Sequence, residues 1–210
     1  MILQGSVEWH LQRIGKVTAS RVADVVARTK TGWGASRANY AAELIAERLT
    51  GVPAVGYQNE AMRWGTETEP RARTAFEFFH DVAIDLAGFA DHPTIPMTGA
   101  SPDGYVGTDG LIEIKCPTVA THIDTLLGKT VPAKYITQMM WQMACTGRAY
   151  CWFASFDPRM PSNMQLYVER VNRDDKLIAS LEADVRMFLQ EIDARITELT
   201  ALYGGMERAA

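Results

Sequence analysis

The sequence is poor in cysteine, in long apolar runs and in basic charge, and each shortage excludes a class of protein. Its three cysteines form no CxxC pair and are too few for a four-cysteine iron–sulfur cluster. No apolar run approaches the roughly 18 residues that a membrane span needs. A net charge of −4 argues against a general nucleic-acid coat protein, which would be basic. No GxxxxGK[ST] segment is present, so ATP-driven unwinding is not expected.

What is present is typical of one globular domain. A chain of 210 residues with 47% apolar and 22% charged side chains buries enough surface for a sizeable core, and no internal repeat or linker divides it. The N-terminus lacks the basic and apolar regions of a signal peptide, so we expect a cytoplasmic protein with reduced thiols. The charge is uneven, because residues 1–40 carry six basic and two acidic side chains, a net charge of +4.

Apolar spacing predicts helices before and after a central group of strands, which is an α/β (α+β) arrangement. Pro70 predicts a break or a fresh first turn in one helix, and Gly204-Gly205 predicts the end of the last helix. The predicted helices cover residues 20–28, 36–50, 59–80, 132–146 and 177–203, a loop covers 29–35, and strands cover 82–86, 103–106, 111–115, 149–156 and 165–171.

The segment with the most chemistry is Asp103, followed ten residues later by Glu113-Ile114-Lys115. Positions two apart in a strand share a face, so Glu113 and Lys115 point the same way while Ile114 points into the core. A hairpin turn at 107–110 places Asp103 opposite this pair. Adjacent carboxylates are unfavourable without a cation between them, and Mg²⁺ prefers such oxygens. The set suits phosphodiester hydrolysis, which needs an activated water and a cation facing the developing charge.

The same residues also fit an exposed hairpin with a salt bridge, a pattern that chance supplies in roughly one such chain in ten. Two observations favour the metal site. Glu113 and Lys115 lie in an apolar run, Leu-Ile-Glu-Ile-Lys, where burying charge is costly without a purpose. A second acidic pair, Glu67 and Glu69, precedes Pro70 in a predicted helix.

Asp103 with Glu113-Ile114-Lys115 resembles the signature of PD-(D/E)xK nucleases. Further blocks follow the order of the phage lambda exonuclease, or YqaJ-type viral recombinase, family over roughly residues 6–200. These blocks are Glu8-Trp9-His10, Arg13-Ile14-Gly15, Thr18-Ala19-Ser20, Trp64-Gly65, Glu69, the Ser-Pro-Asp-Gly and Glu-Ile-Lys-Cys-Pro segments, Gln138 and Asp157-Pro158-Arg159-Met160. The resemblance implies a restriction-endonuclease-like core, with a central mixed β-sheet flanked by helices and a long C-terminal helix.

The resemblance also implies a metal-dependent exonuclease that uses two Mg²⁺ ions per active site, with Mn²⁺ as an alternative. Asp103, Glu113 and the Ile114 carbonyl would be metal ligands, and Lys115 would position the attacking water. Glu69 would support the second ion or its water, although the neighbouring proline leaves its aim open.

In the family a residue matching Gln138 helps to hold the water or the lysine. Gln138 and Gln142 are one helical turn apart, so the residues alone also allow an exposed surface pair.

Five further residues match the family's DNA contacts. Arg13, Thr18 and Ser20 match the pocket for a terminal 5′-phosphate, where an arginine fork and a hydroxyl-capped helix start would bind an anion. Met62 matches an apolar wedge that parts the terminal base pair, although a helical methionine is as often a core residue. Lys30 matches a loop cation that touches DNA.

The implied organisation is one nuclease domain over 1–210. Its N-terminal helical region at 1–58 would bind the 5′-phosphate, 59–171 would form the catalytic core, and 172–203 the C-terminal helix. The implied activity is 5′→3′ digestion of duplex DNA with 5′-phosphorylated ends, releasing mononucleotides and leaving a 3′ overhang for recombination. An endonuclease on the same core and a non-catalytic DNA-end-binding module are the alternatives.

Assembly follows partly from size. A domain of this length has a radius of gyration of roughly 17 Å, too small to enclose a duplex alone. The family forms trimeric rings, so we expect a homotrimer, with a single-strand annealing protein as partner and no membrane association. The resemblance also implies a phage or prophage origin in a bacterial host.

Overall fold

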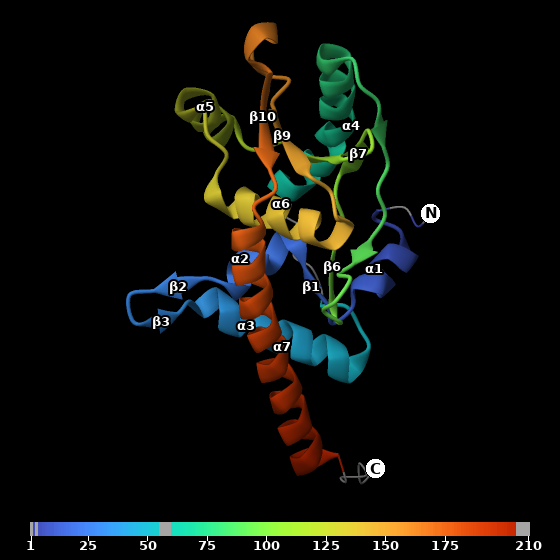
Figure 1. The fold of residues 1–210 in the computed structure, drawn as a ribbon, viewed down its shortest axis with the longest axis vertical. Helices are drawn as coiled ribbons and strands as arrows, with labels where there is room; N and C mark the ends of the chain where they lie inside the picture. The colour runs from blue at the N-terminus through green and yellow to red at the C-terminus, as the bar shows by residue number, and fades with distance from the viewer. Residues whose placement is uncertain (1, 3, 55–59, 205–210) are drawn as a thin grey trace.

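A mixed sheet of five strands, in the order β10-β9-β8-β7-β4, lies at the centre of the fold (Figure 1). The computed structural model describes residues 2, 4–54 and 60–204. β8 and β9 run parallel, and the other neighbours in this sheet are antiparallel. The strands span Ile84–Asp85 (β4), Gly104–Val106 (β7), Gly110–Lys115 (β8), Tyr150–Phe156 (β9) and Leu166–Asn172 (β10).

A smaller three-stranded sheet brings the N-terminal region against the centre of the molecule. Its order is β1-β6-β5, with bounds Val17–Thr18, Thr98–Ala100 and Ala90–Asp91, and β1 pairs with β6 in parallel. Val17 pairs with Thr98, so this sheet joins the start of the chain to the segment just before Asp103.

Helices flank both sheets. α4 packs against β8, β9 and β10, while α6 contacts α2, β6 and α7. In Figure 1 the long α7 runs from the sheet past α3 and ends at the opposite end of the molecule from α4 and α5. The helices span Val7–Arg13 (α1), Val22–Val25 (α2), Ala35–Thr50 (α3), Glu60–His80 (α4), Val119–Gly128 (α5), Ala133–Thr146 (α6) and Asp175–Tyr203 (α7), and two 3₁₀ turns span Ala19–Arg21 (η1) and Ser162–Met164 (η2).

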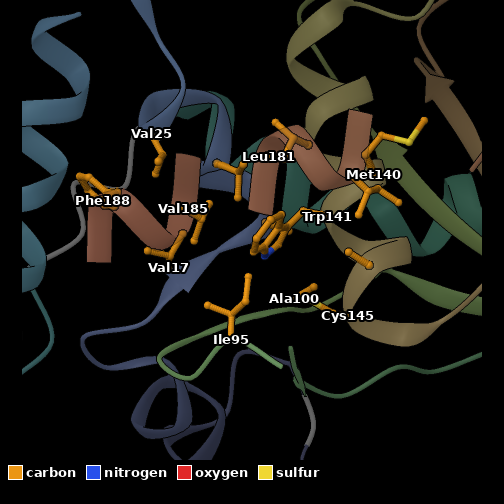
Figure 2. Close-up of a cluster of buried hydrophobic side chains, with 14 of the residues drawn as sticks. Val17, Val25, Ile95, Ala100, Met140, Trp141, Cys145, Leu181, Val185 and Phe188 are labelled. Carbon is orange, nitrogen blue, oxygen red and sulfur yellow. The ribbon is translucent and has the colours of Figure 1, made fainter. Parts of the chain in front are cut away.

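Two hydrophobic cores meet at the central sheet. The larger one joins the N-terminal region to α3, α6 and α7, and Figure 2 shows Trp141, Val185 and Phe188 within it. The smaller one lies between α4 and the other face of the sheet, around Phe76 and Ile112. Successive side chains of β8 point into different cores: Leu111 belongs to the larger core and Ile112 to the smaller one.

The fold class predicted from the sequence is therefore confirmed: a mixed sheet flanked by helices with a long C-terminal helix. Gly204 follows that helix as expected, and Gly205 lies outside the described residues, as do 55–59 at the end of the proposed 1–58 region. None of the helices in the described part of the chain combines the length and apolarity needed to cross a membrane.

The predicted break at Pro70 is wrong, since α4 continues through it from residue 60 to 80. Proline costs an interior helix about 3 kcal/mol. Pro70 is exposed, however, while Thr68, Ala72 and Phe76 are buried against the sheet. Packing of that inner face offsets the lost backbone hydrogen bond.

Three other local predictions are also wrong. The helix expected over 20–28 is one 3₁₀ turn followed by the four-residue α2. The loop expected over 29–35 carries a hairpin, β2 (Arg28–Thr29) with β3 (Gly32–Trp33), which projects from the body in Figure 1. The strand expected over 82–86 shrinks to β4, and Leu86 is 50% exposed.

Candidate active site

The β7–β8 hairpin places Asp103 beside β8. The backbone N–H of Asp103 donates to the carbonyl of Ile112 at 3.2 Å, which continues the strand pairing. Its carboxylate Oδ2 accepts a hydrogen bond from the N–H of Ile114 at 2.6 Å. The side chain is therefore fixed next to the strand that carries Glu113, as the spacing of the residues predicts.

Glu113 lies at the centre of a polar cluster. Its side chain is fully buried, and it forms a salt bridge with Lys115, two residues along the same face of β8. Two α6 side chains complete the cluster: Gln138 Nε2 donates to Glu113 Oε1 at 2.6 Å, and Gln142 Nε2 donates to Glu113 Oε2 at 2.5 Å. The interpretation as an exposed hairpin is therefore wrong, because Glu113, one partner of the salt bridge, is fully buried.

The charges in this cluster shift one another's pKa. Burial raises the pKa of Asp103 well above its usual value, and the negative charge of Glu113 raises it further. Burial acts to lower the pKa of Lys115, but Glu113 and Asp103 together raise it above its usual value. A protonated lysine thus lies between two carboxyl groups that resist being charged together.

Glu69, on α4, is a further acidic residue whose charge acts on this cluster. It contributes to the raised pKa of Asp103, after burial and the charge of Glu113. Glu69 Oε1 is held by Arg73 Nη2 at 2.9 Å, one helical turn away. The Glu69 carboxylate is thus already paired with a cation.

The donor set fits a hard divalent cation. Asp103, Glu113 and the Ile114 carbonyl offer oxygen ligands of the kind that Mg²⁺ prefers. The raised pKa of Asp103 marks a buried negative charge that a cation would relieve. Within residues 2, 4–54 and 60–204, no three acidic, histidine or cysteine side chains form a ready metal cluster, so the carbonyl and water would complete the coordination.

The cluster opens into a cavity of about 150 Å³ that reaches the N-terminal region. Asp103, Glu113, Lys115 and Gln138 line it on one side, and Arg13, Thr18 and Ser20 are among the residues lining the other. The sequence-predicted phosphate pocket and the predicted catalytic residues therefore face the same space, although about ninety residues separate them in the chain.

A second cavity, of about 350 Å³, continues from the first and shares Arg13, Thr18 and Ser20. The hydroxyls of Thr18 and Ser20 lie 3.5 Å apart. The helix start expected to help bind an anion is only a three-residue 3₁₀ turn, so the hydroxyls and the arginine remain as the anion-binding groups.

Arg13 differs from the other cations of this cavity. Lys16 pairs with Asp91, and Arg21 pairs with Asp24 and Glu43. Arg13 instead lies 3.7 Å above the ring of Trp9 and has no ion pair among the described residues. Burial lowers its pKa, opposed by nearby Tyr40 and Glu47, but an arginine remains charged in a protein.

The two remaining predicted DNA contacts occupy different places. Met62 lies at the start of α4, is 54% exposed and lines the larger cavity, so the interpretation as a core residue is wrong. Lys30 lies in the exposed turn of the β2–β3 hairpin, away from both cavities. Trp33, in the same hairpin, is covered by Arg28 and Arg37, with each guanidinium within 4.0 Å of the ring centre.

Sequence reasoning assigned no role to three residues of the site. Gln142 appeared only as half of a surface pair, yet it is fully buried. Arg73 holds Glu69, at a spacing of four that a helix would have indicated. The Trp9 ring lies against the Arg13 guanidinium. Its Nε1 donates to Ser101 Oγ at 2.9 Å, a contact between distant segments that no local pattern reveals.

Comparison with known proteins agrees with this geometry. Residues 8–149 match the model of the YqaJ-like viral recombinase domain. Crystal structures of an alkaline exonuclease from Laribacter hongkongensis, one of them in complex with dAMP, are 50% identical, with a TM-score of 0.89 over 95% of this chain and 98% of that one.

A phage-related exonuclease from Haemophilus somnus 129PT is 17% identical, with a TM-score of 0.73 over 88% of this chain and 96% of that one, and shares the fold. The family match spans well over half of the chain, including the β7–β8 hairpin and the N-terminal pocket. The chain therefore belongs to the YqaJ-like viral recombinase domain family.

Proposed function

We propose that this protein is a DNA exonuclease that digests the 5′-ended strand of a duplex and leaves a 3′ single strand. The observation that carries the proposal is the shared cavity, in which Arg13, Thr18 and Ser20 face Asp103, Glu113 and Lys115. The alkaline exonuclease named above, 50% identical over nearly the whole chain, supports a nuclease activity.

The chemistry proposed is metal-dependent phosphodiester hydrolysis. Mg²⁺, or Mn²⁺ in its place, would supply a Lewis acid that activates water and offsets charge on the phosphate. Asp103, Glu113 and the Ile114 carbonyl would hold it. Lys115 keeps its proton beside Glu113 and presents an ammonium to the attacking water and the developing negative charge.

Glu69 and Gln138 would complete the site. In the present arrangement the Glu69 carboxylate is paired with Arg73. It would have to leave Arg73 in order to bind a second ion. Gln138 fixes one oxygen of Glu113 and so keeps Lys115 and the carboxylate in register.

End recognition would come from the basic side of the cavity. A terminal 5′-phosphate is a dianion, and Arg13 is the cation there whose charge no described carboxylate neutralises by pairing. The hydroxyls of Thr18 and Ser20 add donors beside it. An arginine fork of this kind binds phosphate in two parallel hydrogen bonds.

Strand separation and assembly extend the proposal. Met62 projects into the larger cavity and would act as a wedge at the terminal base pair, while Lys30 on the exposed hairpin would contact the duplex. A homotrimeric ring would keep the duplex on the enzyme, which one domain is too small to enclose. An annealing protein that receives the 3′ strand is the proposed partner.

A digestion time course tests the function. Linear duplex with 5′-phosphate ends should release acid-soluble mononucleotides in Mg²⁺ and none in EDTA, with label at the 5′ end released before label at the 3′ end. Nicking of closed circular duplex at a comparable rate would show an endonuclease instead. Binding of DNA ends without any nucleotide release in Mg²⁺ or Mn²⁺ would favour a non-catalytic module.

A further inference from the structure

We propose that Gln142 is a positioning residue of the active site, which orients the Glu113 carboxylate and sets the affinity for the divalent ion. The inference rests on the proposed metal-dependent function and adds a residue to it. Its basis is the pairing of one buried amide with one buried carboxylate: Gln142 Nε2 lies 2.5 Å from Glu113 Oε2, and both side chains are fully buried.

The direction of this hydrogen bond is fixed by chemistry. An ionised carboxylate only accepts, so the amide must turn its NH₂ group toward Glu113. The amide oxygen Oε1 then faces Cys151 on β9, with Sγ at 4.0 Å, where a thiol can serve as a weak donor. The bond to Glu113 therefore fixes the orientation of the Gln142 amide, and its oxygen lies toward the Cys151 thiol.

The two glutamines divide the carboxylate between them. Gln138 donates to Oε1 and Gln142 to Oε2, and Lys115 also bonds to Oε1. A carboxylate has about four lone-pair directions in total. Three are used by these donors, which leaves one, so Glu113 can offer a cation a single oxygen in a defined direction.

The position of Gln142 on its helix makes this arrangement rigid. It lies on α6, one turn after Gln138, among buried neighbours such as Trp141 and Met143 that belong to the larger core. A buried amide without a partner is costly, so the bond to Glu113 is strongly favoured once α6 packs. Gln142 is not among the residues that line either cavity described above, which makes it a support for a ligand and not a ligand itself.

The test compares Gln142→Met with Met143→Leu in full-length protein freed of metal. Methionine keeps the length and volume of Gln142 but donates no hydrogen bond, whereas the control changes an equally buried side chain of the same helix that belongs to the larger core. Mn²⁺ binding is measured by electron paramagnetic resonance without DNA. Loss of an outer-shell partner typically weakens metal affinity about 10–100-fold, and we expect a shift of that size for Gln142→Met and none for Met143→Leu.

Two further readouts separate positioning from general damage. Nuclease activity of Gln142→Met should recover largely at high Mn²⁺, and binding of a 5′-phosphorylated duplex end in EDTA should equal wild type. Gln142→Asn, which retains an amide too short to reach Glu113, should behave like the methionine variant and serves if that one does not fold.

Wild-type Mn²⁺ affinity in both Gln142 variants would overturn the inference, as would an equal loss in Met143→Leu or no Mn²⁺ binding by wild type. If wild type binds Mn²⁺ with the expected dependence on Gln142 but digests no DNA, the proposed function fails while the positioning role stands.

Discussion

The acidic cluster and the Arg13 pocket lie at two ends of one cavity system, yet they are built in opposite ways. At Glu113 both carboxylate oxygens have donors, and the side chain is fully buried. At Arg13 the guanidinium lies on Trp9 and lines both cavities, with two hydroxyls nearby and no paired carboxylate among the described residues.

This difference separates two tasks. The acidic cluster is assembled before any substrate arrives, because its groups satisfy one another and leave one direction open on Glu113. The pocket has its positive charge only partly compensated, so a dianion would gain more there than at a site already neutralised. A fixed acidic end and a cationic end open to a ligand are what the proposed exonuclease, acting from a strand terminus, would require.

Loss of the Lys115 ammonium should have the largest effect. It should impair hydrolysis at the acidic cluster and leave the Arg13 pocket intact. Lys115→Ala should lower nucleotide release about 10²–10⁴-fold, because no cation then faces the water and the developing charge. Lys134→Ala is the matched control, since Lys134 lies over the same Tyr135 ring but forms no bond with Glu113. Initial rates of acid-soluble release decide between them; comparable rates for the two variants would exclude the proposed role.

Removal of Arg13 should impair recognition of the 5′-phosphate and leave the acidic cluster intact. Arg13→Ala should erase the preference for 5′-phosphorylated over 5′-hydroxyl ends, with the loss, about 10–100-fold, confined to phosphorylated substrate. Arg21→Ala should retain the preference, because Arg21 lines the same cavity but is neutralised by Asp24 and Glu43. The measurement is kcat/KM on the two kinds of end, and a wild type that does not distinguish them would refute the pocket.

Asp103→Asn should stabilise the metal-free protein. The pKa of Asp103 is raised by burial and by Glu113, so keeping it ionised at neutral pH costs folding free energy. An asparagine oxygen can still accept from Ile114, and the free energy of unfolding in EDTA should rise by about 1 kcal/mol. Thermal melts measure this, with exposed Asp85→Asn as control; a lower melting temperature for Asp103→Asn would contradict the electrostatic account.

Asp157, at the end of β9, should respond to pH with the opposite sign and the smallest effect. Hydrogen bonds from Arg159 hold its pKa below the usual value, so its contribution to stability is complete above about pH 4 and is lost as pH falls through the folded pKa. Asp157→Asn should therefore flatten the loss of stability in that acid range by under about 1 kcal/mol, because Arg159 is solvent-exposed. Denaturant titrations between pH 2 and 6 measure it, and parallel curves for the two proteins would exclude this linkage.

The sequence sufficed where a local rule carries the geometry. Strand alternation placed Glu113 and Lys115 on one face, and the hairpin turn brought Asp103 to them. Helical spacing placed Gln138 and Gln142 on one face of α6, but spacing does not reveal what that face packs against. The burial of Gln142 and the bonding of both amides to Glu113 are tertiary facts.

Other features depend on contacts that are distant in the chain. α4 runs through Pro70 because its inner face packs on the sheet, and a local proline rule misses this. The small sheet joins Val17 to Thr98, and this pairing, with the Trp9–Ser101 hydrogen bond, brings the Arg13 region to the β7–β8 hairpin. The residues of the acidic cluster and of the Arg13 pocket could thus be predicted from motifs. That the two groups share one cavity system could not be derived from residue spacing.

The position of β8 between the two hydrophobic cores has a consequence for thermal behaviour. Leu111 is anchored in one core and Ile112 and Ile114 in the other, with Glu113 between them on the strand. Loosening of either core would shift the strand that carries the catalytic side chains. We therefore expect the site to have no melting transition of its own, so that loss of function on heating coincides with the cooperative unfolding of the sheet.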